Sequence, residues 1–452
     1  MLLFPFLYAV SFFYATRSVV KKEYADALTF FVFGLPIYIT SLTVLHQMDL
    51  DELLPFFQYS KEIIVLLAFL MILARFDKWP TFNLLDKLIM VYFFWNLLYV
   101  LLPIGGYSVY EKAIAFKNMA FFPFVYFIGR WIDPKQFSIS KLQAMVMVLG
   151  VAAAAVLIAE LAMNTHLQTF TGYADYYQQF FNVEPAGNYG LSWSFEIEGG
   201  VKRFASFFAN PLEHAASSVL AAGVLVSYWS QSTLPEKKVF IAALVCSLLT
   251  IIFALSRASM AGYILASYLY FLITGNKRVL WFYHGALMLV LAVFIYLLSN
   301  DIVADFFIDT LSFTNSSSLS HLLEWMDGIE AMAANPMGLG LGESGRVAGE
   351  FGLNVGGENQ LIIIGVQTGI LAMTLYILIY AKVIQWSARL FQNGTGSDRQ
   401  LGILLFVFKT GLIVAVLTAA IESYLYVSFT GWFLTGIMSS AIDANRLQSA
   451  QR

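Results

Sequence analysis

Long apolar segments separated by short polar ones run along the whole chain. A helix needs about 20 apolar residues to cross the hydrocarbon core of a bilayer. Segments of this kind lie near residues 2–16, 25–46, 60–75, 86–104, 110–129, 141–163, 211–229, 238–255, 258–275, 279–299, 360–388, 401–421 and 425–442. The first and third are short for a span. The pattern predicts an all-α polytopic membrane protein with about 12–13 transmembrane helices.

The composition agrees with this class. Hydrophobic residues make up 59% of the chain and charged residues only 12%, whereas soluble domains carry about 25% charged residues. The N-terminus lacks a basic region followed by a short apolar core and a cleavage site, so we expect a retained first span. The single cysteine, Cys246, excludes a disulfide framework and a cysteine metal site.

The lysines and arginines gather in alternate loops, which indicates the cytoplasmic side. These residues are Arg17, Lys21, Lys22, Arg75, Lys78, Lys87, Arg130, Lys135, Lys141, Lys237, Lys238, Lys277, Arg278, Lys382, Arg389, Arg399, Arg446 and Arg452. The N-terminus is then outside and the C-terminus inside. Loops 164–210 and 300–359 become two long external loops of one membrane domain, residues 1–452. Lys61, Lys112 and Lys117 are among the few basic residues assigned to the external side.

Two arginines are candidates for binding phosphate on the external side. Arg203 lies near the end of the first long loop, before Asn210-Pro211, which is typical of a helix start. Arg257 lies in a short turn between two apolar segments, where a cation needs an anionic partner. Because guanidinium groups bind phosphate in a bidentate way, two of them suit a diphosphate. The alternatives are a snorkelling arginine and a turn cation paired with a lipid phosphate. Lys117, near the outer end of its segment, is a further phosphate candidate.

The stretch Ser316–Gln360 is too polar for a span, and it begins as an amphipathic helix. Leu319, Leu322, Leu323, Met326 and Ile329 recur at helical spacing, which predicts a helix on the membrane or on the bundle. His321 and Trp325 share one face, although His321 alone is more typical of a structural polar residue. The helix is expected to end at Asn335-Pro336. Gly338, Gly340 and Gly342 then allow a close-packed return or amides that face an anion.

Glu358-Asn359 lies at the mouth of the next apolar segment. A carboxylate there is stabilised by the helix dipole or acts as a general base beside the arginines. Aromatic residues of the first loop suit either sugar stacking or an interfacial belt; they are Tyr173, Tyr176, Tyr177, Phe180, Phe181, Tyr189, Trp193 and Phe195. Asp301, Asp305 and Asp309 have a spacing that fits a metal, but a solvated helix face is favoured, so no metal or cofactor is expected.

The ordered set of motifs resembles the superfamily of bacterial O-antigen ligases and O-antigen polymerases. The matching pieces are Arg203 to Asn210-Pro211, Ser256-Arg257, Trp325 with Asn335-Pro336-Met-Gly338-Leu-Gly340, and Asn359 followed by Gly365 and Gly369. They cover roughly residues 200–370. Ligases carry His-Asn where this chain has Glu358-Asn359, and usually an arginine at the position of His321. These departures favour a polymerase, with a ligase as the alternative.

The resemblance implies a GT-C-like membrane glycosyltransferase of the bacterial inner membrane, with its active site on the periplasmic or exterior face. The substrate would be a glycan on undecaprenyl diphosphate, destined for O-antigen, lipopolysaccharide or exopolysaccharide. Arg203 and Arg257, helped by Lys117 or His321, would hold the diphosphate, and Glu358 would be the base. Trp325, Asn359 and Asn210 are the other candidate substrate residues. Membrane lipids and a chain-length regulator are implied as partners, and nucleic acid is not.

A lipid-linked glycan transporter is the alternative from another class. Transporters place ionisable residues near the bilayer midplane and often contain inverted repeats. Here the candidates are expected at one face, beneath two long loops, and no repeat is visible in the sequence. The pattern therefore favours an enzyme.

Overall fold

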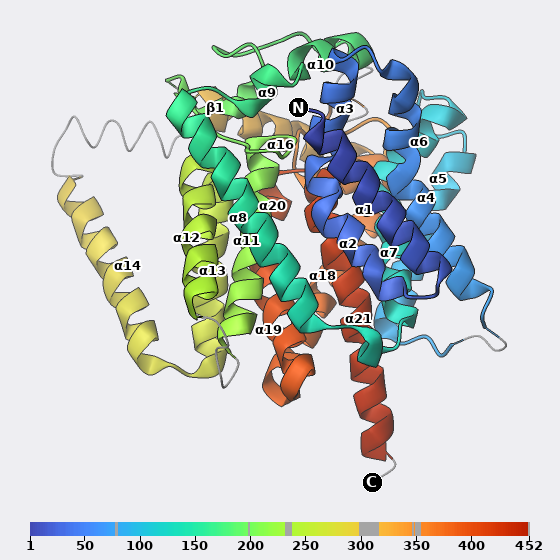
Figure 1. Ribbon diagram of the computed structural model, residues 1–452, viewed down its shortest axis with the longest axis vertical. Coiled ribbons are helices and arrows are strands. Elements are labelled where there is room, and N and C mark those ends of the chain that lie inside the picture. Colours follow the sequence, from blue (N-terminus) through green and yellow to red (C-terminus); the bar gives the residue numbers. More distant parts are fainter. Residues whose placement is uncertain are drawn as a thin grey trace.

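The protein is a bundle of long helices whose axes run roughly along one direction (Figure 1). The computed structural model describes residues 1–76, 80–197, 199–230, 237–297, 316–345, 348 and 354–450. Its long helices are α1 (Leu3–Val20), α4 (Leu54–Leu73), α5 (Leu84–Leu101), α8 (Ile139–Met163), α11 (Pro211–Trp229), α12 (Lys237–Ala254), α13 (Arg257–Thr274), α14 (Lys277–Leu297), α16 (Ser316–Ala334), α18 (Gln360–Asn393), α19 (Gly396–Gly411) and α21 (Leu425–Ala450).

Shorter elements complete the fold. The short α-helices are α2 (Ala27–Phe33), α3 (Tyr38–Gln47), α6 (Val109–Ala120), α7 (Phe122–Trp131), α9 (Leu167–Phe170), α10 (Tyr173–Phe181) and α20 (Ile413–Thr418). The 3₁₀ turns are η1 (Tyr24–Asp26), η2 (Leu35–Ile37), η3 (Asp51–Leu53), η4 (Pro134–Gln136), η5 (Trp193–Phe195) and η6 (Ile421–Ser423). Strands β1 (Glu196–Ile197) and β2 (Val201–Lys202) pair antiparallel in a small hairpin.

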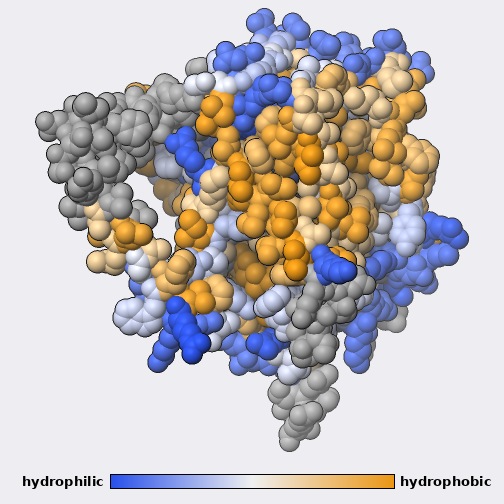
Figure 2. Space-filling view, turned by 60° about the vertical axis from the view of Figure 1, so that its left-hand side comes forward, coloured by the Kyte–Doolittle hydropathy of each residue, from blue (hydrophilic) through white to orange (hydrophobic). Residues whose placement is uncertain are grey.

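The helices confirm the predicted all-α membrane class. Each of the thirteen predicted segments coincides with helix, and eight helical segments of the described residues are long and apolar enough to cross a membrane. These eight are Leu3–Val20, Tyr24–Gln47, Asp51–Leu73, Leu84–Leu101, Ile139–Met163, Gln360–Asn393, Gly396–Thr418 and Leu425–Arg446. Figure 2 shows a hydrophobic band between two hydrophilic ends of the molecule.

Two chain features differ from the predicted segments. Segment 110–129 is broken between α6 and α7, where Phe121 joins the helices and Pro123 lies in the first turn of α7. The segment near 60–75 begins earlier than predicted, because α4 starts at Leu54 and contains Lys61, which is buried. Assigning Lys61 to an external loop was therefore wrong. Its ammonium group is accommodated inside the bundle because Tyr38 Oη accepts a hydrogen bond from it at 2.8 Å.

The two chain termini lie at opposite ends of the bundle, and the loops are divided between these two ends. Figure 1 shows the N-terminus at the upper end with α9, α10, β1 and α16, whereas the C-terminus lies at the lower end. Helix α8 runs between the two ends, so its first turn, with Lys141, lies opposite the loop that follows the helix. The two stretches predicted as long external loops, so far as they are described, therefore share one end of the molecule.

Helix α16 confirms the predicted amphipathic helix and shows which face packs. Trp325 and Met332 pack with Ile362 and Val366 of α18. The predicted apolar stripe lies elsewhere, since Leu319, Leu323, Met326 and Ile329 are all exposed. The helix itself lies on the bundle through its other face, which was one of the two predicted alternatives, and contact of the exposed stripe with the membrane surface stays a prediction.

The glycine-rich segment after α16 is hydrogen-bonded to α18 at the point where the helical geometry of α18 is interrupted. The backbone of α18 leaves helical geometry at Thr368 and Gly369. Leu339 N donates to Val366 O at 2.7 Å, and Gly340 N donates to Gln367 O at 3.0 Å. The side chain of Gln367 accepts from Gly342 N at 2.9 Å. Of the two alternatives for these glycines, the close-packed return is the one observed, because these amides have partners within the chain.

Helices α7 and α21 cross so closely that a side chain cannot fit between them. A Cβ atom added at Gly436 would lie 2.1 Å from the Tyr126 carbonyl oxygen, and one at Gly129 would lie 2.1 Å from the Phe433 carbonyl oxygen. At Gly150 of α8, by contrast, an added Cβ would meet no atom within 4 Å.

We expect Gly436→Ala to lower the free energy of unfolding by about 1–3 kcal/mol, because the crossing must open to admit the methyl group. Thermal unfolding of purified protein in detergent measures this. The matched control, Gly150→Ala, is expected to keep or slightly raise the melting temperature, because alanine has the higher helix propensity. Equal melting temperatures for Gly436→Ala and the wild type would contradict the close crossing.

Candidate functional site

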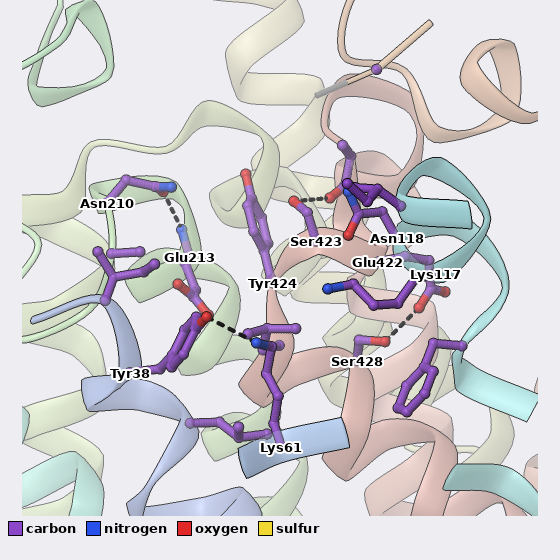
Figure 3. A pocket seen from close by; sticks show the side chains of 18 of the residues that line it. Tyr38, Lys61, Lys117, Asn118, Asn210, Glu213, Glu422, Ser423, Tyr424 and Ser428 are labelled. Atoms are coloured by element: carbon purple, nitrogen blue, oxygen red, sulfur yellow. Dashed lines mark hydrogen bonds between the residues drawn. The ribbon is translucent and has the colours of Figure 1, made fainter. Parts of the chain in front are cut away.

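A cavity of about 870 Å³ opens at the end of the bundle that carries α10 and α16. Its walls come from α3, α4, α6, α10, the start of α11, the turn before α18, and the chain from η6 into α21. Four carboxylates line it, from Glu62, Glu213, Glu358 and Glu422, together with the ammonium groups of Lys61 and Lys117. Figure 3 shows how the polar side chains converge on the space between these elements.

Glu358, Asn210 and Lys117 line this cavity as predicted site residues. Glu358 is exposed and follows the turn Gly356-Gly357, where both glycines have a positive φ. Asn210 caps α11, because its side-chain oxygen accepts from Glu213 N at 2.9 Å. Lys117 comes from α6, and its Nζ lies 3.1 Å from Glu62 Oε1.

Arg203 is held at the edge of the site by the end of a helix. Its Nε donates to the Ala254 carbonyl at 3.1 Å, and Phe204 N donates to the Phe253 carbonyl at 3.1 Å. These carbonyls end α12, where free acceptors and the helix dipole favour a cation. A short turn follows α12, and Arg257 is the first residue of α13. The fold therefore brings together two arginines that lie 54 residues apart in sequence.

The charges around Arg203 show which predicted residues are neighbours. Burial lowers the pKa of the Arg203 guanidinium, and the positive charge of Arg257 lowers it further. Tyr424 and Glu358 act in the opposite direction and raise it. Arg257 and Glu358, the other two residues predicted to be catalytic, thus each lie within electrostatic reach of Arg203. Arg203 and Arg257 do not line the cavity itself, so they form a cationic edge beside it.

Tyr424 joins the cationic edge to the cavity. Burial raises its pKa well above the usual value, and the carboxylates of Glu358 and Glu213 raise it further. Its hydroxyl therefore stays protonated at neutral pH and is a neutral hydrogen-bond donor between the acidic wall and Arg203. Figure 3 shows the Tyr424 ring standing between Glu213 and Ser423.

Glu422 forms the floor of the cavity and has several donors around it. Tyr376 Oη donates at 2.6 Å, Ser428 Oγ at 2.5 Å and Trp432 Nε1 at 3.0 Å. Lys409, buried in α19, lies within electrostatic reach of this carboxylate. Glu422 therefore supplies an opposite charge near this buried ammonium group.

The other predicted site residues lie outside the cavity wall. Asn359 is the N-cap of α18, and its Oδ1 accepts from Leu361 N at 2.9 Å and from Ile362 N at 3.3 Å. Trp325, a residue of α16, packs on α18. The side chain of His321 lies outside the described residues, as do Asp301, Asp305 and Asp309. Their predicted roles stay predictions.

Sequence reasoning missed four lining residues, namely Glu62, Glu213, Glu422 and Tyr424. A signal existed for two of them. Glu62 interrupts an apolar segment directly after Lys61, and Glu422 stands in a turn of a few residues between two apolar segments. Ionisable residues in such positions mark functional sites by default. Within the described parts of the chain, no group of three His, Cys, Asp or Glu side chains is placed to hold a metal ion.

The fold and the cavity together define a polytopic membrane protein with a polar site at one end of its bundle. The family model described as O-antigen ligase matches residues 242–377, from within α12 into α18. This match supports the placement of the chain in the O-antigen ligase and polymerase superfamily, with a membrane glycosyl-transfer function in the broad sense. The matched part contains Arg257, Trp325, Glu358 and Asn359. No curated protein matches the chain.

The cap at Asn359 gives a direct test of what fixes the start of α18. We expect Asn359→Ala to lower the free energy of unfolding by about 1 kcal/mol, because two amides of the first turn lose their acceptor. The control, Asn359→Asp, keeps an acceptor at the same place and is expected to retain the wild-type stability. Denaturant or thermal unfolding in detergent measures both. A fully stable Asn359→Ala protein that has lost glycosyl transfer would instead support the predicted substrate contact.

Proposed function

We propose that the protein is a surface-polysaccharide polymerase, which joins glycan repeat units carried on undecaprenyl diphosphate. The observation that carries the proposal is the neighbourhood of Arg203, Arg257 and Glu358 beside a polar cavity at the end of the bundle that bears the two long loops. The O-antigen ligase match supports the broad class of glycosyl transfer. The departures at Glu358 and His321 favour the polymerase.

In this proposal the two arginines bind the diphosphate of the donor. A guanidinium group donates bidentate hydrogen bonds to phosphate oxygens and remains charged at physiological pH. Because Arg203 is partly buried and fixed by the α12 carbonyl, it needs little reorganisation when charge develops on the leaving group. Preorganised cations of this kind are usually the largest contribution to catalysis.

The acceptor supplies a sugar hydroxyl, and Glu358 takes its proton. The acceptor oxygen forms a bond to the anomeric carbon of the donor while the bond from that carbon to the diphosphate oxygen breaks. The electron pair of the broken bond leaves with the diphosphate, which the arginines stabilise. Attack opposite the leaving group inverts the anomeric carbon. A stable diphosphate leaving group makes a general acid unnecessary, and the step as written needs no metal.

Three substitutions test the assignment of residues. We expect Arg203→Ala and Arg257→Ala each to lower the rate of polymer formation by about 10²–10³, by loss of a charge-stabilising donor. For Glu358→Gln we expect a loss of about 10²–10⁴, by loss of the base. Polymer length on a gel from cells that express each variant at equal level is the measurement. Lys202→Ala is the control, since this neighbour of Arg203 contacts Asn164 instead. Normal ladders from all three variants would end the proposal.

A ligase is the second candidate, because the matching family model is that of O-antigen ligase. It would transfer finished glycan from undecaprenyl diphosphate to a lipid A-core or another acceptor. The lipid intermediate that accumulates in cells without the protein separates the two. We expect a single repeat unit on lipid; finished polymer on lipid would instead identify a ligase. Transfer by purified protein in detergent, without a sealed compartment, would exclude a transporter.

A further inference from the structure

Helix α16 runs beside the first part of α18 and in the same direction. Gly328 lies against Ile362, since a Cβ atom added at Gly328 would be 2.3 Å from the Ile362 side chain. Directly after α16, the Pro336 carbonyl accepts a hydrogen bond from Ile370 N at 3.0 Å. The second contact lies eight residues beyond the first on both segments. Two turns of α16, about 12 Å, therefore lie along α18.

After Pro336 the chain turns back along α18. Gly340 N donates to Gln367 O at 3.0 Å, and a Cβ atom added at Gly345 would be 3.1 Å from the Ile363 side chain. The contacts on α18 thus move back toward its start as the chain continues. Helix α16 and residues 335–345 form a hairpin, called here the α16 hairpin, with its tip at residues 336–337.

The tip of the α16 hairpin lies level with the last two turns of α5. Tyr99 Oη donates to the Met337 carbonyl, and Trp95 Nε1 donates to Thr368 O at the break beside the tip. Helix α5 is long and apolar enough to cross a membrane, and it ends at Leu101. Trp95 and Tyr99 precede Leu101 by six and two residues. The tip is therefore about 3–9 Å inside the end of a membrane span.

The hairpin exposes apolar side chains next to those that α18 exposes. Ile329 of α16 and Met337 at the tip are 56% and 59% exposed. Beside the tip, Ile370 and Leu371 of α18 are 40% and 48% exposed. Because α18 is long and apolar enough to cross a membrane, its exposed apolar side chains are those that meet lipid. The apolar surface of the hairpin continues this lipid-facing surface.

The other flank of α16 is acidic. Successive residues of a helix are about 100° apart, so Asp327 and Ile329 lie on nearly opposite flanks of the face that packs on α18. Asp327 and Glu330, three residues further on, are both exposed. A helix with one apolar flank and one charged flank is typical of the boundary between lipid and water.

We propose that the α16 hairpin enters the bilayer leaflet at this end of the bundle, where phospholipid acyl chains cover Ile329 and Met337. Backbone groups at this depth need partners from the protein, because water is absent. The tip has such partners, since Gly338 N donates to Asn335 O at 2.8 Å and Ile370 N donates to the Pro336 carbonyl. The inference does not depend on the proposed polymerase function.

The hairpin also bears on the position of Glu358. The turn before this residue packs directly on α16, because a Cβ atom added at Gly328 would be 2.8 Å from the Gly356 Cα. A Cβ atom added at Gly357 would be 2.2 Å from the Glu324 carboxylate. No side chain separates the turn from the helix. A hairpin in the leaflet therefore holds Glu358 close to the boundary of lipid and water, where the polar heads of membrane lipids lie.

Fluorescence quenching in lipid nanodiscs tests what surrounds the stripe. In a Cys246→Ser background, a nitrobenzoxadiazole label is attached to Ile329→Cys, Met337→Cys or Asp327→Cys. Interfacial helices bury their apolar side about 5–10 Å into the boundary between headgroups and acyl chains, so phosphatidylcholine with a doxyl group high on one acyl chain should quench the first two labels about threefold more than the third. Iodide in the water should give the reverse order.

Two further positions give the reference values. Leu378→Cys lies on the exposed apolar face of α18 and reports lipid, whereas Lys135→Cys lies in the exposed turn η4 and reports water. All variants are compared only if their melting temperatures equal that of the Cys246→Ser protein. Ile329→Cys and Met337→Cys are independent, so one variant that does not fold leaves the other to decide.

Two outcomes would overturn the inference. Iodide quenching at Ile329 and Met337 equal to that at Asp327 would place the hairpin above the membrane. Protection of the two labels from both quenchers would show that protein, such as a second copy of the chain, covers the stripe instead of lipid. Neither measurement involves glycosyl transfer, so failure of the proposed function would leave the result unchanged.

Discussion

The break in α18 at Thr368 and Gly369 is the constraint on which the candidate site depends. Within a membrane every backbone group needs a partner from the protein. The carbonyls freed by the break are taken by Leu339 and Gly340 and, from α5, by Trp95 Nε1, which donates to Thr368 O at 2.8 Å. The polar stretch that follows α16 is thereby fixed to the bundle. From this stretch, Gly345 N donates to Asn354 Oδ1 at 2.8 Å and Ser344 Oγ donates to the Val355 carbonyl at 2.6 Å. The stretch held at the break therefore also holds the turn that carries Glu358.

Helix ends position the remaining candidate residues. Arg203 is bound to the last carbonyl of α12, Arg257 begins α13, and Asn210 caps α11. Helix termini offer unsatisfied donors and acceptors with a preferred charge, so each end fixes a polar side chain at the boundary of the apolar bundle. A site built in this way needs little regular structure in the loops above it. Only a short hairpin and short helices are found in the described part of the first long loop.

The sequence predicted the helices well because apolar length is a strong and local signal. It predicted the cavity poorly because a charged residue with a partner on another helix cannot be distinguished from a loop residue in the sequence alone. Lys61 is the clearest case, since inside the bundle Tyr38 accepts a hydrogen bond from it and the Glu62 carboxylate lies 3.4 Å away. The glycine series was equally ambiguous, because its partners lie in α18, about 25 residues further on. Contacts of this range do not show in the periodicity of a single segment.

The division of the cavity between matched and unmatched parts of the chain bears on specificity. The part that matches the O-antigen ligase family contributes Glu358 to the cavity and Arg257 to the cationic edge beside it. Other walls of the cavity come from α3, α4 and α6, with Lys61, Glu62 and Lys117, and this part lies outside the match. In the proposed reaction the leaving diphosphate is common to every donor, whereas the acceptor differs from one polysaccharide to another. Residues that serve the common step are expected to keep a family pattern. Residues that meet the acceptor are free to vary, so in this proposal the unmatched walls of the cavity would carry the selectivity of this protein.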